Sequence, residues 1–195
     1  MVQQLATLVD IKAGLQFRGS IPEDAGGNAF ALQMRDIGAD GAVAWAGLTR
    51  TSLAGYKSIA WLRPGDVVFV ARGVRNYALC LDEVPLPTVC SQYFFLLRTR
   101  SPSLLPEFLA WQINRAPVQR YLATHAEGSA QLSIRRGVLE ALPIVLPPVA
   151  DQRRIVALAR EAGRERQLLE TMIRNRERQL DALAVDLHAR QSSHR

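Results

Sequence analysis

Residues 139–156 read LEALPIVLPPVADQRRIV, and the composition of the chain changes within this stretch, at Pro147-Pro148. All ten prolines lie at or before Pro148, among short apolar runs and glycines. Residues 149–195 contain no proline and one glycine, Gly163, among many Arg, Glu, Gln, Leu and Ala residues, which is a composition typical of a helix. The stretch therefore predicts two parts, a mixed domain over residues 1–148 and a long helix over residues 149–195.

The apolar residues after Pro148 follow each other mostly in steps of three and four, which places them in one stripe along a helix, although Arg166 and Arg176 also fall in it. From Asp151 to Arg190 such a helix is about 60 Å long, too long for its stripe to be buried against one domain. A coiled coil with a partner helix is the favoured interpretation, and a helix that folds back on its own domain is the alternative. The predicted contact residues are Ile155, Leu158, Ala162, Leu169, Ile173, Leu180, Leu183 and Leu187.

The first 148 residues favour short strands followed by helices. The expected strands are residues 59–62, 67–71 and 89–98, and a last apolar segment covers residues 139–146. One helix is expected to begin at Pro106 and a second after Pro117, because proline is tolerated in the first turn. This order predicts an α+β fold with a curved or barrel-like mixed sheet, followed by the long C-terminal coiled-coil helix.

Arginine dominates the charge of the chain. Lys and Arg total 24 against 18 Asp and Glu, which gives a net charge of +6 and a pI near 10.0. Only Lys12 and Lys57 are lysines, so 22 of the 24 basic residues are arginines. The planar guanidinium group binds phosphate or guanine through two parallel hydrogen bonds. The balance permits nucleic-acid binding, and a GC-rich genome that replaces Lys by Arg throughout is the alternative cause.

The sequence lacks the motifs of several enzyme classes. It has no P-loop, no G-x-S-x-G or H-E-x-x-H pattern, and no Asn/Asp-Pro-Pro-aromatic tetrapeptide of an amino-methyltransferase. Asp10-Ile11-Lys12 has acid-x-Lys spacing, but with no acid upstream it does not make a nuclease site. Cys80 and Cys90 do not form a zinc-ligand pattern with the three histidines, and buried thiols are favoured over a disulfide. We expect a protein that is not an enzyme and holds no cofactor or metal.

No run of residues approaches the roughly 20 apolar residues that a membrane span requires. Residues 1–10 also lack the basic start, apolar run and cleavage site of an export signal. The sequence therefore predicts a cytoplasmic protein.

Three stretches carry a family resemblance. The first comprises GSAQLSI at residues 128–134, LEALPIVLPP at 139–148 and DQRRIV at 151–156. The second is LRPGDVVFVARG at 62–73, and the third is FRG at 17–19 with QMRDI at 33–37. In this order and spacing they resemble the specificity subunits of type I restriction-modification systems. In that family a Gly-Ser/Thr loop, a proline-rich apolar strand and an acid-Gln pair end the recognition domain and open a long helix.

The resemblance implies a target recognition domain over residues 1–148 and a dimerisation and spacer helix over residues 149–195. Family members more often have Glu-Gln where Asp151-Gln152 stands, and either acid can cap a helix. Full-length members carry two recognition domains and two helices, whereas this chain has one of each. A half-length subunit that homodimerises through antiparallel helices and reads a palindromic bipartite site is therefore expected, and a remnant of a longer subunit is the alternative.

The partners implied by the resemblance are double-stranded DNA, a methyltransferase (modification) subunit and, where one is present, a restriction subunit. Those partners would hold S-adenosylmethionine, ATP and Mg²⁺. The residues expected to contact DNA are polar or basic and lie in predicted loops, where they supply donors to base edges and phosphates. They are Arg18, Arg35, Arg72, Arg75, Asn76, Tyr77, Ser129, Gln131, Arg135 and Arg136.

Two other functions are compatible with the same residues. An independent DNA-binding regulator would use the basic domain and the dimer helix without a methyltransferase partner. A protein-interaction adaptor would use the long helix alone, with the arginines reflecting genome composition. For each candidate DNA contact, a solvated turn residue is the competing interpretation.

Overall fold

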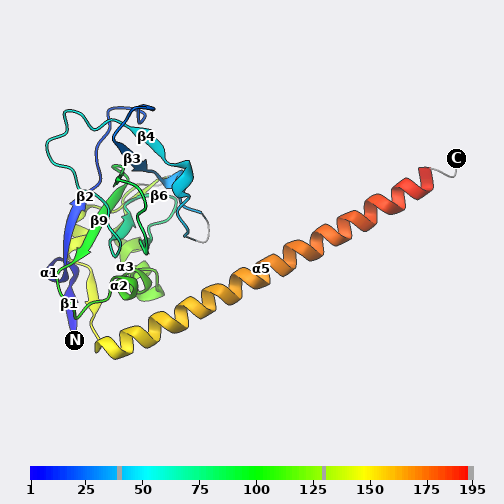
Figure 1. Ribbon diagram of the computed structural model, residues 1–195. Helices are drawn as coiled ribbons and strands as arrows, with labels where there is room; N and C mark the ends of the chain where they lie inside the picture. The colour runs from blue at the N-terminus through cyan, green and yellow to red at the C-terminus, as the bar shows by residue number, and fades with distance from the viewer. Residues whose placement is uncertain (39–40, 129–130, 193–195) are drawn as a thin grey trace. The chain divides into compact units, whose positions relative to one another are not determined.

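The computed structural model describes residues 1–38, 41–128 and 131–192, with side chains up to residue 188 (Figure 1). The chain divides into two compact units, Met1–Arg153 and Arg154–Arg195. The first unit contains strands, short helices and the first turn of the last helix. The second unit is the remainder of that helix. The start of the helix thus groups with the domain, a little beyond the predicted boundary at residue 148.

The expected α+β class with a long C-terminal helix is confirmed. The strands are β1 Val2–Gln4, β2 Val9–Ala13, β3 Ala29–Leu32, β4 Thr49–Thr51, β5 Val67–Val70, β6 Arg72–Gly73, β7 Ala78–Cys80, β8 Thr88–Cys90, β9 Phe94–Thr99, β10 Leu132–Ser133 and β11 Pro143–Val145. The helices are α1 Leu5–Leu8, η1 Met34–Asp36, η2 Trp45–Gly47, α2 Pro106–Ile113, α3 Ala116–His125, α4 Arg136–Glu140 and α5 Val149–Ser192.

The largest sheet is four-stranded and antiparallel, in the order β2-β9-β5-β7. All four residues of β5 are buried, which agrees with its uninterrupted apolar sequence VVFV. Phe69 of β5 lies opposite Phe95 of β9, and Ile11 of β2 lies opposite Leu97 on the other edge of β9. The sheet therefore forms around β9, the longest strand of the group.

A second, mixed sheet has the order β4-β3-β8, with β3 antiparallel to β4 and parallel to β8. A tight turn joins β8 to β9, and in it the Phe94 amide donates to the Ser91 carbonyl at 3.1 Å. Two short ladders, β1-β11 and β6-β10, complete the pairing. In the described ranges the strands thus form four sheets and no closed barrel.

Two sequence-based strand predictions are corrected by the structure. Residues 89–98 are not one strand, because the turn at Ser91 divides them between β8 and β9. Residues 59–62 belong to no strand. Among the residues that the structure describes, a single backbone bond links them to a strand, from the Leu62 amide to the Thr88 carbonyl at 2.9 Å. Burial of Leu62 holds this segment in place without a ladder.

Both predicted helices of the domain are confirmed as α2 and α3, each with a proline in its first turn. Two amide side chains at the end of α2 join it to strands. Gln112 accepts a bond from the Val145 amide at 2.8 Å and donates to the Val145 carbonyl at 2.9 Å. Asn114 makes the same pair of bonds with Ala78, at 2.9 and 2.7 Å. These amides satisfy backbone groups at the edges of β11 and β7, which would otherwise be left without partners.

Gln152 fixes the first turn of α5 inside the domain. Its side chain is fully buried, and its Nε2 donates to the carbonyls of Ser103 and Pro147 at 2.7 and 2.8 Å. Its Oε1 accepts the Leu105 amide at 2.9 Å. The sequence predicts a helix start at Asp151-Gln152, but the structure shows that the glutamine is a buried connector.

The turn before β5 contains a partly buried ion pair, in which the carboxylate is buried and the guanidinium is not. Asp66, 2% exposed, receives both the Nε and the Nη2 of Arg98 at 2.7 Å, and it also accepts the Arg63 amide at 2.8 Å. Arg98 further donates to the Trp61 carbonyl at 3.0 Å. The hydrogen bonds that Arg98 donates to Asp66 raise the pKa of its guanidinium, and burial opposes this shift. The Gly-Asp motif of residues 62–73 therefore has a structural role, linking the turn to β9.

Candidate nucleic-acid interface

Two segments that the sequence analysis predicts separately as DNA-contacting loops lie side by side in the structure. Strand β6 pairs with β10 so that Arg72 is opposite Ser133 and Gly73 is opposite Leu132. The Ile134 amide extends this contact by donating to the Ala71 carbonyl at 2.9 Å. Segment 72–77 and segment 131–136, about 60 residues apart in sequence, therefore form one surface, which we call the β6–β10 surface.

Strand β6 and the turn that follows it present one arginine each. Arg72 and Arg75 are exposed, as is Val74 between them. In the described part of the chain neither guanidinium forms an ion pair with a carboxylate. Both groups are therefore free to meet an anion such as a phosphate.

Asn76 holds this turn from inside. It is only 5% exposed, and its Nδ2 donates to the carbonyls of Val70 and Ala71 at 3.0 and 3.1 Å. Buried amides with satisfied donors are part of the fold. Asn76 thus positions Arg72 and Arg75, and we do not include it among the surface contacts.

Tyr77 is half-buried and packs against the core that contains Phe94 and Leu96. Burial raises the pKa of its phenol, while the nearby charge of Arg75 lowers it. The Tyr77 carbonyl accepts the Val70 amide at 2.8 Å. The residue thus joins the turn to the core and leaves part of its ring accessible.

Helix η1 reaches strand β6 through the side chain of Met34. A Cβ on Gly73 would come within 2.9 Å of the terminal methyl of Met34, so helix η1 approaches β6 closely. The next residue, Arg35, is 66% exposed, and its Nη2 donates to Thr49 Oγ1 at 2.8 Å. Three stretches of the resemblance, from residues 33–37, 62–73 and 128–134, therefore converge here.

The β10 side carries Gln131, Arg135 and Arg136, all exposed. Arg135 pairs with Glu127 at 2.8 Å and Arg136 with Glu140 at 2.7 Å, and both pairs are open to solvent. Ser129 lies outside the described residues. Gly128, with φ of 95°, precedes it, and a Cβ there would overlap the Gln131 carbonyl oxygen, so this loop requires glycine.

Arg18 belongs to a different site. It lines a pocket of about 660 Å³ with Gln16, Phe17, Pro22 and residues 54–56. The Phe17 and Tyr56 rings lie 6.0 Å apart between centroids. The residues that line this pocket include none from segments 72–77 and 131–136, so Arg18 is not grouped with the other candidates.

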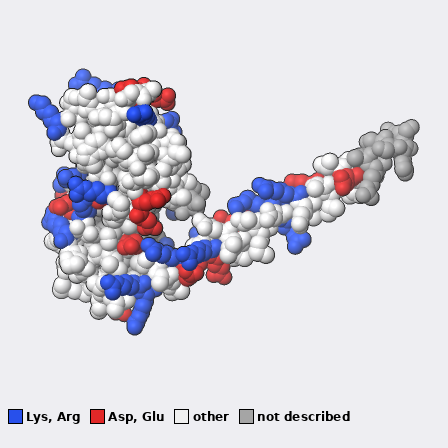
Figure 2. Space-filling model, in the orientation of Figure 1, with Lys and Arg blue, Asp and Glu red and all other residues white. Residues whose placement is uncertain are grey.

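Basic side chains do not form one continuous patch on the visible face of the molecule. Figure 2 shows Lys and Arg in several groups, with Asp and Glu between them. The exposed pairs of Arg135 and Arg136 show how part of the charge is neutralised. The candidate interface is therefore defined by the placement of a few arginines and amides, and net charge alone would not have located it.

The described residues contain no group of three or more His, Cys, Asp or Glu side chains that could hold a metal ion. Neither cysteine forms a disulfide, and burial raises the pKa of the Cys90 thiol to about 12. Cys80 is only half-buried, so the expectation of two buried thiols holds fully for Cys90 alone. Among the described helices, none is both long enough and apolar enough to cross a membrane.

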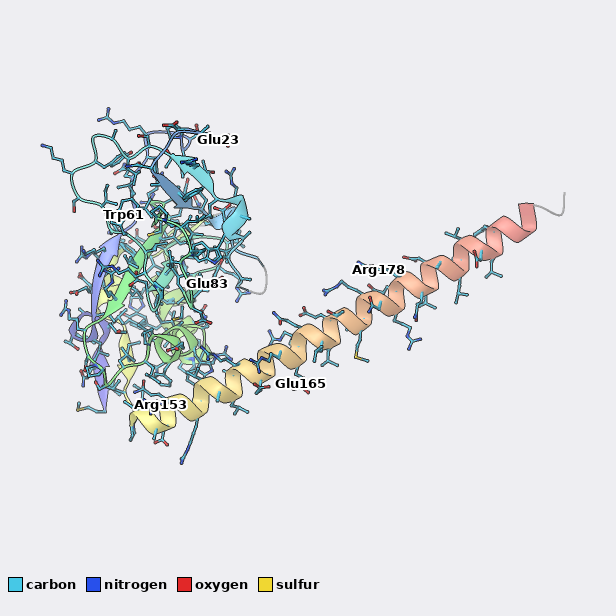
Figure 3. The ribbon with its side chains drawn as sticks, viewed as in Figure 1. Glu23, Trp61, Glu83, Arg153, Glu165 and Arg178 are labelled. Carbon is cyan, nitrogen blue, oxygen red and sulfur yellow. The ribbon has the colours of Figure 1, made fainter. Side chains whose placement is uncertain are left out.

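The predicted contact residues of the long helix lie in one uninterrupted helix, α5. Ile155 is half-buried and the other seven are exposed. Figure 3 shows side chains, Glu165 and Arg178 among them, projecting along the length of the helix. Their role in a coiled coil stays a prediction.

No protein-family model matches the sequence, and no curated protein is significantly similar to it. Solved structures do match the fold. The S subunit of a type I restriction-modification system from M. genitalium has a TM-score of 0.52 and 16% identity, over 81% of this chain and 37% of that chain. The HsdS subunit from Thermoanaerobacter tengcongensis has a TM-score of 0.60 and 22% identity, over 85% and 37%.

A chain from a structure on complex assembly and conformational transition of the type I restriction-modification system has a TM-score of 0.65 and 23% identity. The match covers 94% of this chain and 43% of that one. The chain thus spans about two fifths of the length of the solved structures that it matches. Its fold is that of one half of a type I restriction-modification specificity subunit.

Proposed function

We propose that this chain is the sequence-specific DNA-recognition subunit of a type I restriction-modification system and has no catalytic activity of its own. The observation that carries the proposal is the β6–β10 pairing, which gathers Arg72, Arg75 and Gln131 on one surface. That pairing occurs in a chain with the fold of specificity subunits. Fold alone would not assign a function, and the surface supplies groups suited to DNA.

The chemistry of this surface fits double-stranded DNA. A guanidinium group can bond the O6 and N7 of guanine together, and a glutamine can do the same with the N6 and N7 of adenine. The two bonds from the Asn76 side chain to the carbonyls of Val70 and Ala71 hold the backbone of the turn after β6, which lowers the loop ordering needed on binding. We assign base reading to Arg72, Arg75 and Gln131.

The neighbouring arginines suit phosphate contacts. Exposed ion pairs such as Arg135–Glu127 and Arg136–Glu140 contribute about 0–1 kcal/mol. A phosphate can therefore replace the glutamate at low cost. Arg35 keeps most of its surface exposed while its Nη2 is anchored to Thr49. These three side chains would fix the register of the domain on the duplex.

The chain spans about two fifths of the matched subunits, so two copies would supply two recognition domains. A symmetric homodimer through α5 would read a palindromic site in two halves with an unread gap. A methyltransferase subunit, and a restriction subunit where present, would bind the dimer and carry S-adenosylmethionine, ATP and Mg²⁺. Such a complex acts on DNA in the cytoplasm.

The test is to co-express the chain with the methyltransferase encoded beside it and to map methylated sites in the host genome. Methylation of one split palindromic sequence supports both DNA reading and the homodimer. A Arg72→Ala, Arg75→Ala double variant should lose this methylation. The matched control is Arg63→Ala with Arg120→Ala, which removes the same charge at exposed positions outside the surface.

Other outcomes decide between the competing functions. An unchanged methylation site in the Arg72, Arg75 double variant would overturn the assignment of the β6–β10 surface. Sequence-specific DNA binding without any complex with a methyltransferase would favour an independent regulator. Binding of a protein partner by α5 with no DNA binding at low salt would favour an adaptor.

A further inference from the structure

Helix α5 carries a regular seam of residues that includes two of its arginines, Arg166 and Arg176. Ten positions follow each other in alternating steps of four and three, which is a heptad pattern of a left-handed coiled coil. They are Ile155, Ala159, Ala162, Arg166, Leu169, Ile173, Arg176, Leu180, Leu183 and Leu187. The five Leu and Ile side chains from Leu169 onward are 53–66% exposed. Such a long seam needs a partner helix of equal length.

The sizes of the seam residues favour an antiparallel copy of the same helix. The N-terminal half contains the small Ala159 and Ala162, and the C-terminal half contains the large Leu180 and Leu183. In an antiparallel pair centred on Thr171, each small residue faces a large one at equal distance from the centre. A parallel pair would place alanine against alanine and leave space at one end, and well-packed cores avoid such voids.

The same centre brings the polar positions together. Arg166 and Arg176 lie equally far from Thr171, so each faces the other in the partner helix. Glu165 and Glu177 are also level with this layer, one on each flank. Each layer thus holds two arginines and two glutamates. Long arginine side chains can reach out of a seam to solvent and to such carboxylates.

Any shift by one heptad would separate these groups. In one direction Arg166 would face Leu183 of the partner helix and Arg176 would face Ile173. In the other direction Arg166 would face Leu169 and Arg176 would face Ala159. A charge packed against an apolar residue loses water without gaining a partner. A polar residue in the seam is known to specify register in this way.

We propose that a second copy of this chain docks on the α5 seam in antiparallel orientation, centred on Thr171, and that Arg166 and Arg176 fix this register. The inference rests on the proposed homodimer and goes beyond it by naming the register. The Arg154 ends of the two helices would then stand about 50 Å apart. A slip of one heptad changes that distance by about 10 Å, the length of about three base pairs. The register would therefore set the gap of the bipartite site.

Cysteine cross-linking of the full chain tests the register. Ala162→Cys and Leu180→Cys are made separately, and the two proteins are mixed and oxidised. In the proposed register Ala162 of one copy faces Leu180 of the other, so the mixture forms a mixed disulfide. Each variant alone does not, because its own two cysteines lie about 27 Å apart along the axis, beyond disulfide reach. The unsubstituted chain controls for Cys80 and Cys90.

Each alternative outcome overturns the proposal. Disulfides in each single variant alone would indicate a parallel pair, and no disulfide in any sample would indicate that another occupant covers the seam. Disulfides between Ala162→Cys and Leu187→Cys would indicate a slipped register. That slipped product is expected only after Arg166→Leu and Arg176→Leu are added to both chains, and its absence there would remove the assigned role of the arginines.

Methylation mapping separates this proposal from the proposed function. If the complex methylates a split palindrome while the cross-links disagree, the register is wrong and DNA recognition stands. If the cross-links agree while no site is methylated, the register stands and the proposed function fails. If the cross-links show the proposed register and the complex methylates a split palindrome, the Arg166→Leu, Arg176→Leu variant should methylate sites with more than one gap length.

Discussion

The two units of this chain treat apolar side chains in opposite ways. In Met1–Arg153, residues such as Leu5, Leu96 and Ile144 are at most 1% exposed. In Arg154–Arg195, Leu183 and Leu187 have 60% or more of their surface exposed. Burial of apolar surface is the main stabilising contribution to folding. The first unit therefore has a hydrophobic core of its own. The second unit has an apolar stripe that is not buried within the unit.

Polar side chains show the same contrast. The first unit buries Asp66, Gln112 and Gln152 and pairs each of them with neighbours. In the second unit the polar side chains whose burial the structure describes are exposed, as for Glu165 and Arg178. Buried polar pairs need exact partners and so specify one structure. From this contrast we predict that changes to buried residues of the first unit lower stability, whereas changes in the second unit act on the proposed dimer.

The largest effect on stability is expected from Asp66→Ala. This change leaves the partly buried Arg98 guanidinium without its carboxylate and removes the bond to the Arg63 amide. Loss of one member of a buried pair costs about 3–5 kcal/mol, and the partial exposure of Arg98 brings the expected loss to the lower end, about 3 kcal/mol. The free energy of unfolding, measured by urea denaturation, should fall by that amount. The matched change Asp10→Ala breaks the exposed pair with Arg100 and should cost about 0–1 kcal/mol. Equal losses of unfolding free energy in Asp66→Ala and Asp10→Ala would show that burial does not strengthen the Asp66–Arg98 pair.

A smaller effect is expected where the two units meet in sequence. Gln152→Ala removes three hydrogen bonds and leaves the Leu105 amide and the Ser103 carbonyl unsatisfied. Buried polar groups without partners cost about 1–3 kcal/mol, so the domain should unfold at lower urea concentration. Arg153→Ala, at the neighbouring exposed position, is the control and should change little. If Gln152→Ala and Arg153→Ala unfold at the same urea concentration, the first turn of α5 does not contribute to the stability of the domain.

A change in the second unit should leave domain stability almost unaltered. Ile173→Asp places a charge in the exposed seam of α5, where a partner helix would have to bury it. We expect the dimer to dissociate in sedimentation experiments while the unfolding free energy of the domain changes by less than about 0.5 kcal/mol. The control is Arg178→Asp, which also introduces an acid but lies off the seam. A domain destabilised by Ile173→Asp would show that the two units are not independent.

The sequence predicts well what depends on local pattern. The change of composition at Pro147-Pro148 predicts the long helix, and proline in a first turn predicts α2 and α3. The apolar run of residues 67–71 predicts β5. Each of these signals is contained in a few neighbouring residues. Patterns of this kind identify elements without knowledge of what they pack against.

Long-range pairing is what the sequence could not supply. The burial of Gln152 depends on Ser103 and Leu105, and the ion pair of Asp66 depends on Arg98, 32 residues away. Asn76 carries a loop-like polar side chain, yet its partners are backbone carbonyls inside the turn. Only the fold determines whether a polar residue meets solvent or a buried acceptor.

The candidate site was predicted as scattered loops, and the structure decides which of them meet. Gln131 and Arg72 come together because β6 pairs with β10, while Arg18 lies in a separate pocket. Both strands are two residues long, so neither has enough alternation to be recognised from sequence. The family resemblance identified the stretches of sequence, and the pairing of β6 with β10 shows how two of them are arranged.

The smallest expected effect concerns Tyr77, which packs against the core and also borders the β6–β10 surface. Burial holds the pKa of its phenol above the ordinary value of 10.0, so the folded state favours the neutral form. The contribution to stability is complete below pH 10, where the unfolded chain is also neutral, and it is lost as the pH rises through the folded pKa. Tyr77→Phe removes this titration. The free energy of unfolding should therefore fall less steeply above pH 10 in Tyr77→Phe than in the unsubstituted chain, with the difference between them measured against pH 8. Identical slopes would show that the ring is solvated in the folded domain, which would place Tyr77 entirely on the β6–β10 surface and not at its junction with the core.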